Sequence, residues 1–159
     1  MVANNGWVIV ATLLVALLFH TIPLPLEWRW FRPELVILTL FYWSLALPHR
    51  IGIVSAAATG LVVDILNGTA VGALAMGMAV ADVFILLNYQ RIRQFDGLQQ
   101  SMTLGILVAL SLLVEHWLRR AVGLGGAGIA FLWSVPLTLI CWLPLREILR
   151  RLRRQFEVL

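Results

Sequence analysis

The sequence lacks lysine altogether and has little charge of any kind. Of its 159 residues, 13% are charged and 61% are hydrophobic, and the mean hydropathy is +0.92. Water-soluble domains are usually about 45–50% apolar and about 25% charged. A chain of this length could not bury so many apolar side chains in its own interior. Lipid is therefore expected to be the solvent for most of the protein, and the seven Trp agree, because indole rings favour the membrane interface.

Cysteine and recognisable catalytic motifs are also scarce. The single cysteine, Cys141, lies in an apolar run and excludes both an intrachain disulfide and a cysteine-cluster metal site. There is no nucleophile elbow, no His-Glu-x-x-His and no pair of carboxylates in an aqueous loop. His20, His116 and Asp64 have unrelated spacings, which is weak evidence for a metal site. The sequence predicts a protein that is not an enzyme and has no cofactor and no metal.

What the sequence does contain is a series of six apolar segments joined by short connections. Only helices and closed barrels can cross lipid without stranding backbone polar groups, and these runs are too long and too unalternating for barrel strands. The predicted fold class is an all-α membrane protein, a compact bundle of about six transmembrane helices. Pro23 and Pro25 should end the first helix. The segments cover residues 7–26, 33–48, 51–67, 70–89, 99–119 and 129–148.

The arginines predict the orientation of the bundle, because cytoplasmic loops carry an excess of basic residues. With both termini in the cytoplasm, eight arginines lie at cytoplasmic ends and four at outer ends. Residues 1–148 are then the membrane domain, and 149–159 form a basic cytoplasmic tail that continues the last helix. The eight are Arg50, Arg91, Arg93, Arg146, Arg150, Arg151, Arg153 and Arg154, and the four are Arg29, Arg32, Arg119 and Arg120.

Two features of the loops and tail have more than one interpretation. The run 123–128 matches Gly-x-Gly-x-x-Gly by letter, but it follows a membrane helix instead of a strand, so a turn is favoured over a dinucleotide site. The tail, with Arg150, Arg151, Arg153 and Arg154, either anchors on anionic lipid or docks an acidic cytoplasmic partner. Nucleic acid is not expected as a partner, because the arginines lie at the ends of apolar runs.

Small residues are dense in the third and fourth segments. Gly60, Gly68, Gly72 and Gly77 are predicted to let helices approach closely. This packing is expected to be internal, with a helix of another protein as the alternative.

Asp64 is surrounded by apolar residues, where a carboxylate is costly unless it is paired. It lies fourteen residues after Arg50, which places it about 21 Å into the membrane at about 1.5 Å per residue. Arg32 begins the preceding segment at similar depth, so a structural ion pair of Arg32 and Asp64 is predicted. His20, Glu115 and His116 lie near the same outer end and are predicted to line a cavity or to contact a partner.

Several elements of residues 31–76 resemble a known family. They are "FRP" at 31–33, "YW" at 42–43, "LPHR" at 47–50, and the glycines that flank Asp64 and lead into a Gly/Ala-rich helix. Together they resemble MreD, the rod-shape-determining family of Gram-negative bacteria.

The resemblance implies a non-catalytic inner-membrane component of the cell-elongation machinery. The partners it implies are MreC, the actin-like MreB, a SEDS glycosyltransferase and a class B penicillin-binding transpeptidase, which together make lateral peptidoglycan. It also implies a fold similar to the six-helix substrate-binding subunits of ECF transporters, with an outward-facing cavity. A scaffold is therefore the leading prediction. The alternatives are a small-molecule or lipid-intermediate binding subunit that uses that cavity, and a membrane enzyme.

Overall fold

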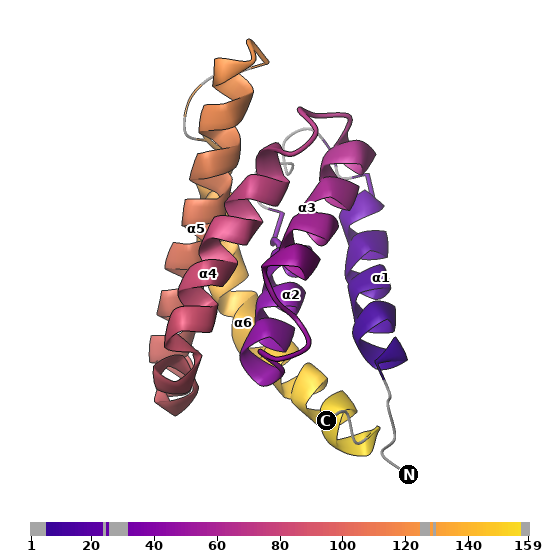
Figure 1. Ribbon diagram of the computed structural model, residues 1–159, viewed down its shortest axis with the longest axis vertical. Helices are drawn as coiled ribbons and strands as arrows, with labels where there is room; N and C mark the ends of the chain where they lie inside the picture. Colours follow the sequence, from indigo (N-terminus) through magenta and orange to yellow (C-terminus); the bar gives the residue numbers. More distant parts are fainter. Residues whose placement is uncertain (1–5, 24, 26–31, 125–127, 129, 157–159) are drawn as a thin grey trace.

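The computed structural model describes residues 6–23, 25, 32–124, 128 and 130–156. In this part of the chain the protein is all α-helical, as predicted, with six α-helices and one short 3₁₀ helix (Figure 1). Arg29, Gly125 and the last three residues of the predicted tail lie outside the described residues. The elements are α1 (Trp7–Thr21), α2 (Leu35–Ala46), α3 (Ile53–Asn67), α4 (Ala73–Gln94), α5 (Gly97–Ala121), η2 (Ala130–Trp133) and α6 (Ser134–Gln155).

Helix α2 forms the centre of the bundle. Every residue from Val36 to Leu45 is buried, and α2 contacts α1, α4, α5 and α6. A helix that is apolar on all sides needs such a surrounding. Its 12 residues span only about 18 Å, less than the roughly 30 Å hydrocarbon core of a bilayer. The short second apolar segment is therefore a buried core helix.

The remaining helices pack around α2. Helix α4 lies between α3 and α5 and packs extensively on both, while α1 and α6 cover other faces of α2 (Figure 1). The start of α1 and the end of α6 lie at one end of the bundle (Figure 1). We call this the terminal end; α2, α4 and α6 finish there. At the opposite end, the last turns of α1, α3 and α5 meet the starts of α2, α4 and α6.

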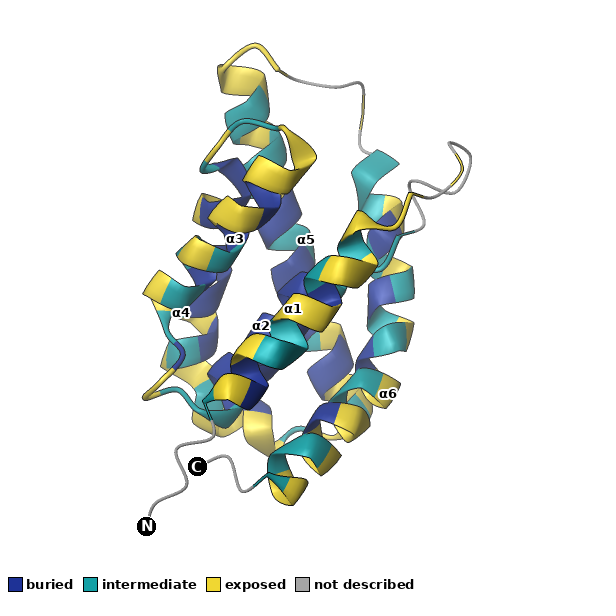
Figure 2. Cartoon of the chain, turned by 90° about the vertical axis from the view of Figure 1, so that its right-hand side faces the viewer, coloured by how far each residue is buried: buried dark blue, intermediate teal, exposed yellow. Residues whose placement is uncertain are grey.

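Apolar side chains cover the outside of the bundle. Helices α4, α5 and the continuous η2–α6 are long and apolar enough to cross a membrane, whereas α1, α2 and α3 are shorter apolar helices. Figure 2 shows exposed residues along the outer faces of the helices, and large apolar side chains such as Leu87 (76% exposed) and Ile106 (69%) are among them. In water such faces would be unfavourable, so the chain is a multi-pass membrane protein.

The helix boundaries follow the predicted segments with specific differences. Helix α1 ends at Thr21, before Pro23, as predicted. Helix α4 continues to Gln94, past the predicted end of its apolar segment at residue 89, and α6 runs on into the basic tail as far as Gln155. Charged residues end an apolar run without ending a helix, and arginine is a good helix former. Pro144 lies inside α6, which continues through it.

Candidate functional site

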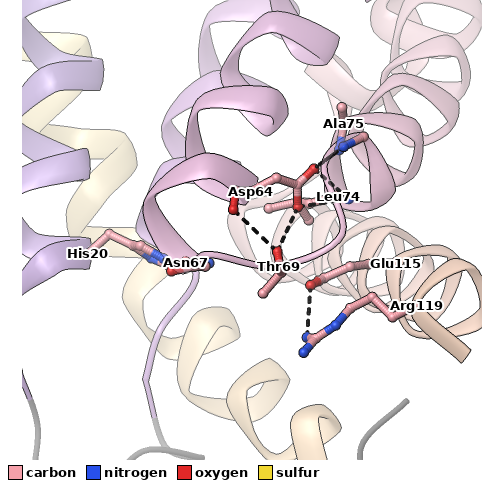
Figure 3. A network of polar contacts seen from close by, with 9 residues as sticks. His20, Asp64, Asn67, Thr69, Leu74, Ala75, Glu115 and Arg119 are labelled. Carbon is pink, nitrogen blue, oxygen red and sulfur yellow. Dashed lines mark hydrogen bonds and ion pairs between the residues drawn. The ribbon is translucent and has the colours of Figure 1, made fainter. Parts of the chain in front are cut away.

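Asp64 lies near the end of α3 and is fully buried. Its carboxylate accepts hydrogen bonds from the backbone N–H groups of Gly72 at 2.9 Å, Leu74 at 3.1 Å and Ala75 at 3.3 Å, and from the Thr69 hydroxyl at 3.3 Å. Figure 3 shows the carboxylate pointing at the first turn of α4. The first N–H groups of a helix have no partner within the helix, and its N-terminus attracts negative charge. Asp64 therefore caps α4 from the preceding helix.

The predicted ion pair of Arg32 and Asp64 is wrong. The Arg32 guanidinium donates to the carbonyl oxygens of Phe19 at 2.9 Å and Ile22 at 3.0 Å, at the end of α1. Carbonyl groups there have no helical donor and attract a cation. The prediction assumed that α2 and α3 are close neighbours, but α3 packs mainly on α4. Each charged group satisfies backbone groups at a helix end.

A polar cavity of about 160 Å³ lies at the opposite end of the bundle. Two of the three residues predicted for this end line it, namely His20 and Glu115. His20 Nε2 is 3.1 Å from the Asn67 side-chain oxygen, and Glu115 pairs with Arg119 at 3.3 Å (Figure 3). His116 does not line the cavity but stacks on Phe131, with ring centroids 4.7 Å apart.

Three further polar residues of this cavity were missed by the sequence predictions. They come from separate elements, and no spacing in the sequence links them. Among the described residues, no group of three or more His, Cys, Asp or Glu side chains could hold a metal ion. The missed residues are Glu34, Asn67 and Ser134; Arg119, one of the four arginines expected at this end, also lines the cavity.

The four predicted packing glycines have two different roles. Gly60 and Gly77 lie at close helix contacts: a Cβ on Gly60 would stand 2.5 Å from the Ala75 Cα, and one on Gly77 would overlap the Ser111 carbonyl oxygen. Gly68 and Gly72 have no neighbour within 4 Å of such a Cβ. For those two the packing prediction is wrong. Their φ angles of 60° and 97° place them in the left-handed region, which the turn between α3 and α4 requires.

Asp82 is a second buried carboxylate, in the middle of α4. It is fully buried, and neither of its side-chain oxygens has a hydrogen-bond partner among the described residues. The nearby polar group is the Ser44 hydroxyl of α2. Asp82 therefore differs from Asp64, whose two oxygens are both satisfied.

Arginines of the terminal end are arranged in three ways. Arg93 donates to the Leu45 and Ala46 carbonyl oxygens at the end of α2, at 2.6 and 2.7 Å. In the predicted tail, Arg151 pairs with Glu147 at 3.4 Å on the exposed surface, and Arg154 is exposed as well. Arg150 and Arg153 line a pocket between α2, α4, α5 and α6.

The chain is similar to known proteins. A model of the family described as rod shape-determining protein MreD matches residues 1–152. The rod shape-determining protein MreD of Haemophilus influenzae is 26% identical over 137 residues, which cover 79% of this chain and 84% of that protein. No solved structure matches. Since the family match extends over nearly the whole chain, the protein belongs to the MreD family of rod shape-determining membrane proteins.

Proposed function

We propose that this protein is a non-catalytic inner-membrane component of the bacterial elongation (Rod) complex. In this role it scaffolds and regulates lateral peptidoglycan synthesis and so maintains rod shape. Its proposed partners are MreC, MreB (directly or through MreC), a SEDS glycosyltransferase and a class B penicillin-binding transpeptidase. The observation that carries the proposal is the family match over residues 1–152.

The use of the polar side chains at the helix ends supports a scaffold. Asp64 and Arg32 both satisfy backbone groups at helix ends, and Gly77 brings α4 and α5 into contact. These groups fix the relative positions of the helices. A partner in the membrane would then recognise the shape of the outer faces, which are apolar.

The proposed orientation places the terminal end in the cytoplasm. This end carries Arg50, Arg91 and Arg93 together with the arginines of α6, and the basic excess of cytoplasmic loops favours that side. The outer cavity with His20 and Glu115 would then face the periplasm. Reaction of single introduced cysteines with a membrane-impermeant thiol reagent, in a Cys141→Ala background, tests the orientation.

Complementation tests the function. In a rod-shaped bacterium depleted of its own MreD-family protein, expression of this chain should restore cell width, and MreC should be isolated with it. An inert control is the Gly77→Leu variant, which cannot keep the contact of α4 with α5. Round cells in the presence of normal amounts of the folded protein would contradict the proposal.

A small-molecule or lipid-intermediate binding subunit is the second candidate, because the outer cavity of about 160 Å³ is lined by polar side chains. Mass spectrometry of molecules that co-purify with the protein tests it, with Glu115→Gln as the variant that should lose them. A fold like the substrate-binding subunits of ECF transporters is part of this candidate. Superposition of an experimental structure on those subunits tests the likeness.

A further inference from the structure

A second polar pocket lies at the terminal end of the bundle, far from the outer cavity. Its volume is about 290 Å³. It is formed by the end of α2, the end of α4, the start of α5 and the middle and end of α6. The residues that line it are Tyr42, Leu45, Ala46, Arg93, Gln100, Trp142, Arg146, Arg150 and Arg153.

Four of these residues are arginines, and no acidic residue lines the pocket within the described part of the chain. Arg93 is held in place by the two carbonyl oxygens of α2. Arg146, Arg150 and Arg153 line the same hollow as Tyr42. Like charges that converge on one hollow repel each other unless an anion lies between them.

Glu147, the carboxylate next to Arg146 in the sequence, does not neutralise this charge. Glu147 pairs with Arg151, outside the pocket, and the other ion pair among the described residues joins Glu115 and Arg119 at the opposite end. The positive charge of the pocket is thus uncompensated by the described residues.

Buried polar atoms in the pocket wall also lack partners. Trp142 is 1% exposed, and its indole N–H donates to no group of the described chain. Buried polar groups are nearly always hydrogen-bonded, so an unpaired donor points to a ligand or water. Gln100 donates to the Ile92 carbonyl oxygen and leaves its own side-chain oxygen, also buried, without a donor. The wall therefore offers many donors and one acceptor.

The size of the pocket and the geometry of its hydrogen-bond donors indicate which class of anion it binds. Small-molecule pockets usually have volumes of about 300–1,000 Å³, so a hollow of about 290 Å³ admits a headgroup and no folded peptide segment. The planar guanidinium forms paired hydrogen bonds with phosphate oxygens. A phosphate has enough acceptor oxygens for several arginines, the phenol and the indole at once, whereas a single carboxylate has two.

The position of the pocket in the membrane indicates which molecule carries the phosphate. The pocket lies where apolar helices give way to arginines, and basic residues gather at the ends of membrane segments, at the level of the lipid headgroups. Basic pockets between membrane helices on the cytoplasmic side bind anionic headgroups. We propose that this pocket binds the phosphate headgroup of an anionic membrane lipid, with Arg146, Arg150 and Arg153 as the groups that contact it.

The test uses the full-length protein in mild detergent and native mass spectrometry. The probes are short-chain phosphatidic acid, whose phosphate is a monoester, short-chain phosphatidylglycerol, inorganic phosphate and a glutamate-rich peptide. The pocket variant is Arg146→Gln/Arg150→Gln. The matched control is Arg151→Gln/Arg154→Gln, which removes the same charge from the same half of α6 outside the pocket. Arg93 is left unchanged because it holds the end of α2.

Phosphatidic acid should bind more tightly than phosphatidylglycerol, and the pocket variant should weaken its binding about tenfold or more. The control variant should weaken it less than about threefold, because Arg151 and Arg154 do not line the pocket and act only as surface charges. Arg150→Lys keeps the charge but loses the planar fork and should give an intermediate loss. Equal thermal stability of the variants without lipid shows that the fold is intact.

Several results would overturn the proposal. Equal losses of lipid affinity in the two double variants would show that the lipid is attracted by the overall positive charge and not by the pocket. Inorganic phosphate that binds as tightly as the lipid would show that the source is soluble. Displacement of the lipid by the glutamate-rich peptide, together with tighter peptide binding, would make the pocket a docking site for a protein.

Discussion

The Asp64 carboxylate accepts a hydrogen bond of 2.9 Å from the backbone N–H of Gly72, across the turn between α3 and α4. The same carboxylate also receives the N–H groups of Leu74 and Ala75. One side chain thereby fixes the start of a membrane helix that packs between α3 and α5. In lipid this matters more than in water, because no solvent can replace a lost hydrogen bond.

Replacement of Asp64 should therefore destabilise the bundle strongly. Asp64→Ala leaves several buried N–H donors without an acceptor, for an expected loss of roughly 2–5 kcal/mol in the free energy of unfolding. Asp64→Asn keeps one acceptor but turns an amide toward other donors, so a smaller loss is expected. Equilibrium unfolding in mixed micelles, followed by circular dichroism, measures both. An Asp64→Ala variant as stable as the parent would contradict the capping role.

Arg32 and Asp64 should act independently of each other. Since they contact different backbone groups, the effects of Arg32→Ala and Asp64→Ala on unfolding should add within about 0.5 kcal/mol in the double variant. A coupling of 1 kcal/mol or more, on the order expected of interacting residues, would restore the ion pair that the sequence had suggested.

The contrast between prediction and structure at Asp64 has a physical cause. Long apolar runs bounded by charges predict helices such as α4 and α5 well, because lipid demands that backbone hydrogen bonds close within the segment. The partner of a buried carboxylate is harder to predict. A charged side-chain partner can be recognised from its residue type, but a backbone N–H group is present at every residue except proline. The estimated depth of Asp64 in the membrane could suggest Arg32 as its partner. The true donors are backbone N–H groups of residues 72–75, and no residue type in the sequence identifies them.

The polar cavity at the end opposite the terminal end was also only partly predictable from the sequence. His20 and Glu115 could be predicted, because a polar residue near the end of an apolar run is conspicuous. Glu34, Asn67 and Ser134 join them only through the arrangement of α2, α3 and α6, which no periodicity in the sequence specifies.

Gly77 and Gly105 offer a matched pair at helix contacts. A Cβ at Gly77 would overlap backbone atoms of Ser111, whereas one at Gly105 would meet the end of the Leu139 side chain. Backbone cannot move aside without shifting α5, but a leucine can change rotamer. Gly77→Ala should therefore cost about 1–3 kcal/mol, and Gly105→Ala less than about 1 kcal/mol. Unfolding of the two variants side by side measures the difference. Equal losses would show that the contact of α4 with α5 is not tight.

Replacement of Asp82 by asparagine should not lower the stability of the protein, in contrast to replacement of Asp64. Its carboxylate oxygens have no partner among the described residues, and an unpaired charge is expensive to bury. Asp82→Asn removes the charge and allows the new amide to donate to the Ser44 hydroxyl. Stability should stay the same or rise by about 1 kcal/mol. A loss as large as that of Asp64→Asn would reveal a partner for Asp82. A stable variant that fails to restore rod shape would assign Asp82 a role in function.

Arg93 should stabilise the end of the central helix. Its guanidinium donates to the Leu45 and Ala46 carbonyl oxygens at 2.6 and 2.7 Å. The carbonyl groups in the last turn of a helix have no N–H donor within that helix. Arg93→Gln cannot reach both oxygens, so a loss of about 1–2 kcal/mol is expected. Arg91→Gln, an exposed change on the same turn of α4, is the control and should stay within about 0.5 kcal/mol. Hydrogen exchange of the last amides of α2 locates the effect: they should exchange faster in Arg93→Gln and at the parent rate in Arg91→Gln. Equal exchange in the two variants would show that the end of α2 is held by packing alone.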